Sequence, residues 1–160
     1  WADDRLIPDI LRSFEKKEPV VVRNPKATRP WQHVLEPLSG YLILAQKLYR
    51  NQEKYAGGWN FGPNDNDVKP VDWILDKMIS KWPNSSWKLD ASSNPHEAGF
   101  LKLDISKAKS QLGWQPSWEL SCTLDKIIAW HRSWLSQEDM QAVSLAEIEE
   151  YMRDMNNENN

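Results

Sequence analysis

The stretch RPWQHVLEPL, residues 29–38, joins an extended segment to an amphipathic helix and carries one arginine, Arg29, where the extended segment begins. Pro37 suits the first turn of a helix because proline has no N–H to leave unpaired there. Apolar side chains then recur at helical spacing: Leu38, Tyr41, Leu42, Ala45, Leu48 and Tyr49. This pattern predicts a helix with these six residues on one face.

Short strands and helices alternate on both sides of this junction. Helices are expected after Pro8 and after Pro70, over 104–112, around 124–134, and behind a capping box at 144–147. Extended segments are expected at 19–23, 29–34, 59–62, 87–89 and 100–103. The sum predicts a small mixed α/β domain over residues 1–155, with short strands and several helices, followed by a disordered tail at 156–160.

The chain shows no glycine-rich turn that could cradle a dinucleotide. Gly57-Gly58 does not match the G-x-G-x-x-G pattern between a strand and a helix. No predicted strand is long enough for the centre of a doubly wound sheet. The sequence therefore argues against a complete Rossmann fold and favours a small domain that docks on a partner domain.

Composition excludes several classes of function. The net charge of −3 over 160 residues leaves no basic surface for nucleic acid. Cys122 is the only cysteine, so no disulfide can form within the chain and a cytoplasmic setting is expected. No apolar run approaches the roughly 20 residues of a membrane span. The three histidines are not at ligand spacing, so no metal site is expected.

Anion recognition is the chemistry that remains. Arg5 precedes a predicted helix, and Arg23 and Arg29 lie on neighbouring extended pieces. Guanidinium groups are permanently charged, forked donors that suit a pyrophosphate, and Arg23 could stack on a nucleobase. Val21 and Arg23 are two residues apart on one strand, so their side chains share a face. An ordinary surface charge is the alternative reading for each arginine.

Several motifs together resemble the extended short-chain dehydrogenase/reductase family, and within it the nucleotide-sugar dehydratases and epimerases. They are WADDRLIPD at 1–9, the junction at 29–38, WNFG at 59–62 and DISKAKSQLGWQP at 104–116. The resemblance covers nearly the whole chain in the expected order. Most relatives carry an arginine shortly before the last motif, whereas this chain has NPHEA at 94–98, which resembles the CDP-glucose 4,6-dehydratase branch of the family.

The resemblance implies a substrate-binding role for seven residues. Arg29 would contact the nucleotide phosphates, and Val21 and Arg23 would flank the base. Arg5 and Leu6 would belong to the helix start that holds the nucleotide. In the loop at 94–98, His96 would contact phosphate or ribose and Glu97 would order the pocket. His33 precedes a predicted helix and is expected to be structural, and His131, between Trp130 and Trp134, is expected to be a surface residue or a helix residue with its hydrogen bonds satisfied.

The family resemblance also implies an activity for a complete enzyme. There, bound NAD oxidises the sugar at C4, water is lost across C5 and C6, and a 4-keto-6-deoxy sugar nucleotide results, for cell-surface polysaccharide. The Tyr-x-x-x-Lys pair and the NAD loop would lie upstream, in a Rossmann domain that this chain lacks, so no catalytic residue is expected here. The expected partners are a CDP-hexose, that Rossmann domain and further copies of the enzyme.

Two alternatives remain open from the sequence. The chain could be a stand-alone nucleotide-binding or regulatory module without lyase activity. It could also be a relative that acts on another nucleotide sugar, because base choice depends on few side chains.

Overall fold

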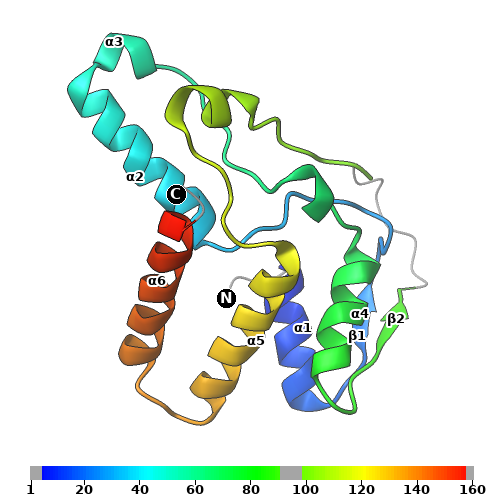
Figure 1. Cartoon of the computed structure of the whole chain (residues 1–160). Helices are drawn as coiled ribbons and strands as arrows, with labels where there is room; N and C mark the ends of the chain where they lie inside the picture. Colours follow the sequence, from blue (N-terminus) through cyan, green and yellow to red (C-terminus); the bar gives the residue numbers. More distant parts are fainter. Residues whose placement is uncertain (1–4, 91–98, 158–160) are drawn as a thin grey trace.

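The computed structural model describes residues 5–90 and 99–157, and its helices and short strands form the predicted mixed α/β fold (Figure 1). The only sheet in that described part is a parallel pair of three-residue strands, with Val21 opposite Lys88. None of the described helices is both long enough and apolar enough to span a bilayer. The elements in chain order are α1 (Leu6–Lys16), β1 (Val20–Val22), α2 (Leu35–Arg50), α3 (Gln52–Tyr55), η1 (Asp65–Asp67), α4 (Val71–Lys81), β2 (Trp87–Leu89), η2 (Ala108–Leu112), α5 (Leu120–Leu135) and α6 (Met140–Asn157).

A first apolar cluster joins α1, β1, α4 and α5, which lie together in the lower part of Figure 1. Each helix contributes the stripe that its sequence period predicts. The buried side chains include Ile10, Leu11 and Phe14 from α1, Ile74, Leu75 and Met78 from α4, and Leu120, Leu124 and Ile128 from α5. In α1, α4 and α5, most of the predicted apolar pattern is buried. However, α1 begins at Leu6, before Pro8, and α5 begins at Leu120, before 124. Trp134 of the predicted stripe is 45% exposed.

A second apolar cluster joins α2, α3 and the segment from Ile105 to Trp114. The predicted helix at 104–112 is present from residue 106, where two α-helical residues lead into η2, a π-helix. Asp104 caps it, because its Oδ1 accepts a hydrogen bond from the Ser106 N–H at 2.8 Å. Gly113 ends it with φ of 70°, a left-handed conformation that glycine adopts without strain. Both predicted helix ends are confirmed.

The buried side of α2 differs from the prediction. The helix begins at Leu35 instead of Pro37, and most of the predicted apolar face is exposed to solvent, with Leu42 73% and Tyr49 93% exposed. The side that packs inward carries Gly40, which lies against the Phe61 ring so closely that a Cβ there would be 2.2 Å from Cδ1. Apolar spacing predicts that a helix has an apolar face, but it does not predict which part of the protein packs against that face.

Three predicted extended segments do not form strands. Residues 29–34 and 59–62 are irregular, and the two are joined by a hydrogen bond from Gln32 Nε2 to the Phe61 carbonyl at 2.9 Å. Of the segment 100–103, only Phe100 forms a bridge, to Thr28.

The last helix begins before its predicted capping box. Asp139 caps α6, since its Oδ1 accepts from the N–H groups of Gln141 and Ala142. Ser144 instead accepts from the Trp130 indole, and Glu147 pairs with His33 at 3.0 Å. α6 continues to Asn157, so the first two residues of the predicted disordered tail are helical, and 158–160 lie outside the described residues.

The buried carboxylate of Glu36 joins α2 to the C-terminal part of the fold by hydrogen bonds. Glu36 has no exposed surface. Its Oε1 accepts from the Trp118 N–H at 2.8 Å, and its Oε2 accepts from the Ser117 N–H at 3.1 Å and from the Tyr151 hydroxyl at 2.8 Å. The side chain of one residue in α2 is thus bonded to the segment before α5 and to α6. Three donors of this kind are what a buried carboxylate requires.

Burial raises the pKa of Glu36 above its ordinary value, although the three donors oppose the shift. The unfolded chain then loses this proton at a lower pH than the folded chain does. The Glu36 contribution to the free energy of unfolding should therefore fall as pH rises above about 4.5, the ordinary glutamate value. Denaturant unfolding at pH 4–7 would measure it, and Glu36→Gln, which cannot ionise, should lack this component. Identical pH slopes for both proteins would contradict the prediction.

The contact between Gly40 and Phe61 predicts a cost for any side chain at this position. Gly40→Ala should lower the free energy of unfolding by roughly 1–3 kcal/mol, because the added methyl overpacks the ring. Helix propensity alone would give the opposite sign, about 1 kcal/mol in favour of alanine. Gly58→Ala is the matched control, because a Cβ at Gly58 meets nothing within 4 Å. A Gly40→Ala variant as stable as the control would show that the contact is not tight.

Candidate functional site

A cavity of about 490 Å³ lies between the start of α1, strand β1 and the segment that follows β1. All five predicted site residues within the described part line it: Arg5, Leu6, Val21, Arg23 and Arg29. The cavity therefore brings together residues that the sequence placed on three separate elements.

The cavity is cationic. Three of its lining residues are arginines and one, Asp9, is acidic. The Asp9 carboxylate is engaged by Arg12 at 2.8 Å, on the next turn of α1. The Arg29 side chain is held partly by the backbone of the preceding residue, since its Nη1 donates to the Thr28 carbonyl at 2.9 Å. An arrangement with this excess of guanidinium groups attracts an anionic ligand.

Strand β1 presents its middle residue to the cavity. Val20 and Val22 are buried, whereas Val21 is 56% exposed. The Val20 N–H donates to the Ser86 carbonyl, and the Val22 carbonyl accepts from the Asp90 N–H. Because these groups alternate along a parallel strand, the main-chain N–H and carbonyl of Val21 point away from β2. The strand thus offers one donor and one acceptor beside the side chains of Val21 and Arg23.

The segment after β1 is positioned by the start of α4. The Val71 N–H donates to the Ala27 carbonyl at 3.0 Å, and the Asp72 N–H donates to the Pro25 carbonyl at 2.9 Å. The Lys26 ammonium also pairs with the Asp72 carboxylate, which raises the pKa of Lys26. These contacts hold the backbone that leads to Arg29.

His96 and Glu97 lie outside the described residues. The described residues on either side of 91–98 are held close to the cavity: the Asp90 N–H donates to the Val22 carbonyl at 2.8 Å, and the Gly99 carbonyl accepts from the Thr28 N–H at 2.9 Å. The roles of His96 and Glu97 stay predictions.

Among the lining residues that were not predicted from the sequence, Asp9, Asn24 and Trp31 have side chains with polar atoms. Trp31 follows Arg29 by two residues, and this closeness in sequence was the available indication that Trp31 lines the cavity. Core packing is the usual role of tryptophan, and Trp31 does pack against the first apolar cluster while lining the cavity. His33 and His131 are both buried and paired, with Glu147 and Glu15 respectively, so their structural roles are supported.

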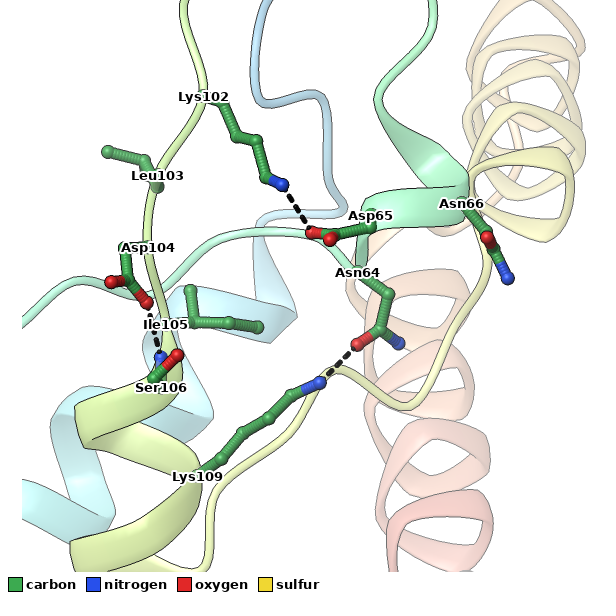
Figure 2. Close-up of a pocket in the computed structure, with 9 residues that line it drawn as sticks. All are labelled: Asn64, Asp65, Asn66, Lys102, Leu103, Asp104, Ile105, Ser106 and Lys109. Carbon is green, nitrogen blue, oxygen red and sulfur yellow. Dashed lines mark hydrogen bonds and ion pairs between the residues drawn. The ribbon is translucent and has the colours of Figure 1, made fainter.

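A second, larger cavity of about 770 Å³ lies between η1 and the segment at 102–109 (Figure 2). Its polar groups bond to one another. Lys102 pairs with Asp65 at 2.8 Å, Lys109 donates to Asn64 at 2.7 Å, and Asp104 accepts from Ser106. The Ser106 N–H lowers the pKa of Asp104. Two lysines balance two aspartates, so the smaller arginine-lined cavity is the stronger candidate for an anion.

No group of three histidine, cysteine or acidic side chains able to hold a metal ion occurs within residues 5–90 and 99–157. The three guanidinium groups that line the smaller cavity can bind a ligand by charge and hydrogen bonds. Their donors suit the oxygens of a phosphate or diphosphate.

Comparison with known proteins identifies relatives of the predicted kind. The chain is 57% identical over 153 residues to CDP-glucose 4,6-dehydratase of Salmonella typhimurium, which covers 95% of this chain and 43% of that enzyme. It is 27% identical over 134 residues to dTDP-glucose 4,6-dehydratase of Escherichia coli, covering 80% of this chain and 37% of the relative. It is 26% identical over 139 residues to UDP-glucuronic acid decarboxylase 1 of Arabidopsis thaliana, covering 86% of this chain and 30% of the relative.

A solved structure shares the fold. UDP-N-acetylglucosamine 4-epimerase from Bacillus cereus superposes with a TM-score of 0.58 at 20% sequence identity, over 82% of this chain and 44% of that one. No family model matches the sequence. The chain spans less than half the length of the curated relatives it matches. The resemblance found in the sequence is thus confirmed: over 95% of its length, this chain is similar to a nucleotide-sugar 4,6-dehydratase.

Proposed function

We propose that this chain is the nucleotide-binding part of a CDP-glucose 4,6-dehydratase, which converts CDP-glucose to CDP-4-keto-6-deoxyglucose. The observation that carries the proposal is the cavity in which Arg5, Arg23 and Arg29 converge, in a chain 57% identical to such an enzyme. A diphosphate matches these cations in charge and in hydrogen-bonding geometry.

The strand edge supports a nucleoside beside the diphosphate. The main-chain N–H and carbonyl of Val21 could pair with the donor and acceptor atoms of a base, and the Arg23 guanidinium could stack on its face. Arg29 lies on the segment after β1, and the phosphates attached to the nucleoside would lie beside it. Binding energy obtained from the nucleotide would position the hexose for the reaction in the complete enzyme.

The expected cofactor of the complete enzyme is NAD, which would accept and return a hydride. The described part of this chain contains no strand, glycine-rich turn and helix in succession that could hold it. Each tyrosine also lacks a lysine four residues later, where Ala45, Glu53, Trp59 and Met155 stand instead. Tyr151, for example, is buried against Glu36. The residues of this chain therefore bind and orient the substrate, and those that hold NAD belong to the rest of the enzyme.

The exposed face of α2 is the proposed contact with the rest of the enzyme. This face consists of Leu38, Tyr41, Leu42 and Tyr49, each at least 44% exposed. Large apolar residues in one stripe on a helix mark a surface that another part of a protein covers. Because this chain spans 43% of the related Salmonella enzyme, the Rossmann domain expected in the remainder is the proposed occupant.

The phosphate role of Arg29 predicts a loss of CDP affinity. Arg29→Ala should weaken CDP binding by roughly 1–3 kcal/mol, the usual value for a hydrogen bond to a charged group. Calorimetric titration of this chain would measure it, with Arg153→Ala on α6 as the exposed-arginine control. Arg23→Ala should weaken the binding of CDP more than it weakens the binding of inorganic pyrophosphate.

Three results would contradict these assignments. Unchanged CDP affinity in Arg29→Ala would remove its phosphate role. Equal losses of CDP and pyrophosphate affinity in Arg23→Ala would remove its nucleoside role. A wild-type chain that binds UDP or dTDP and not CDP would identify a relative acting on another nucleotide sugar.

The docking role of α2 predicts separable effects on stability and association. Leu42→Glu should change the stability of the chain by less than about 0.5 kcal/mol, because Leu42 is exposed. It should weaken association with the separately expressed remainder of the Salmonella enzyme roughly tenfold or more. Sedimentation would measure this, with Leu145→Glu on the exposed side of α6 as the control. Equal association of both variants would place the contact elsewhere, and no association of the wild type would favour a stand-alone module.

A further inference from the structure

Asp9 is an acidic side chain in a cavity that otherwise carries positive charge. Among the described residues that line this cavity, it is the one carboxylate beside three arginines. The Asp9 side chain is 43% exposed, so a ligand in the cavity can reach it. A carboxylate repels phosphates, so Asp9 opposes the binding of a diphosphate. Its role in a nucleotide site therefore has to concern the nucleoside.

The first turn of α1 places Asp9 on the side of the helix that lines the cavity. Asp9 is four residues after Arg5 and three after Leu6, which puts the three side chains on one side of the helix, and all three line the cavity. Arg12, on the next turn, donates from Nη1 to Asp9 Oδ1 at 2.8 Å. This bond orients the carboxylate and leaves the lone pairs of Oδ2 for a donor on the ligand.

The strand edge in the same cavity does not distinguish one pyrimidine from another. Val21 offers one main-chain N–H and one carbonyl. A cytosine can pair with them through N3 and its amino group, and a uracil can pair with them through O4 and N3–H. The arginine side chains are donors only, and the Asn24 amide has both a donor and an acceptor. Among the described lining residues, the acceptor-only side chain of Asp9 is the one that favours the amino group of cytosine.

We infer that Asp9 is a specificity-determining residue of the nucleotide site, where its Oδ2 accepts a hydrogen bond from the exocyclic amino group of cytosine. This inference rests on the proposed function, because it requires a nucleotide in the cavity with its base at Val21. One N–H of the amino group bonds to the Val21 carbonyl and the other bonds to Asp9, so both donors are satisfied. A uracil or thymine has an oxygen at the same ring position, which a carboxylate repels.

The inference assigns Asp9 a role different from that of the arginines. Arg5, Arg23 and Arg29 attract any nucleoside diphosphate by charge. Asp9 weakens the binding of every diphosphate by the same repulsion, and it returns a hydrogen bond to cytosine alone. A site can gain selectivity in this way by rejecting the wrong ligand.

The test compares CDP with UDP, which carry the same ribose and diphosphate. Calorimetric titration of this chain measures both affinities in the wild type and in Asp9→Asn, whose amide keeps the shape of the carboxylate and adds a donor for O4. The wild type should bind CDP roughly tenfold or more tightly than UDP, and Asp9→Asn should bind the two within about threefold of each other. Glu18→Gln is the matched control: it removes an exposed carboxylate beyond the other end of α1 and should keep the wild-type ratio.

The wild-type chain provides a second readout that needs no variant. The side-chain ¹³C carboxyl resonance of Asp9 can be assigned through its own Cα and Cβ atoms. At saturation CDP and UDP bring the same charge, so a difference between their complexes reports the base. The Asp9 resonance should differ between the two complexes, and that of Glu18 should not. An Asp9 resonance at the same position in both complexes would overturn the inference.

The outcomes separate this inference from the proposed function. If the wild type binds neither nucleotide, or binds UDP more tightly than CDP, the proposed function fails and the inference fails with it. If the wild type prefers CDP and Asp9→Asn keeps that ratio, the inference fails while the proposed function stands. Equal affinities of the wild type for CDP and UDP would likewise overturn the inference alone. A preference that is lost in Asp9→Asn and kept in Glu18→Gln supports it.

Discussion

The hydrogen bonds to the Glu36 carboxylate are the interaction on which the rest of the structure depends. A charge without exposed surface costs several kcal/mol unless donors surround it. The donors come from Ser117, Trp118 and Tyr151, more than 80 residues further along the chain. One side chain in the first turn of α2 therefore makes two apolar clusters into one unit.

The same anchor sets the geometry of the candidate site. α2 begins at Leu35, directly after the segment that carries Arg29 and Trp31. One end of that segment is held by the start of α4 through Ala27, and the other by α2 through Glu36. The segment itself forms no strand or helix, so its path depends on these two ends. A short irregular segment can thus hold an arginine and a tryptophan in the lining of the cavity beside β1 and the start of α1.

Sequence reasoning was most successful where several local preferences agreed. α1, α4 and α5 combine apolar spacing with proline or apolar starts, and their stripes form the first cluster as expected. Asp104 and Gly113 predicted both ends of one short helix. It was least successful at α2, where the stripe around Leu42 was real but faces solvent. No local pattern shows that Gly40 would be the residue that meets Phe61.

The amino-acid sequence by itself determined which segments become helices, and it predicted Arg5, Arg23 and Arg29 as the cations of a binding site, because period, caps and charge are local properties. Only the tertiary structure decided that these arginines share one cavity and that Glu36 is buried. Burial and hydrogen bonding depend on contacts between residues far apart in the chain. Those contacts exist only after the helices have packed.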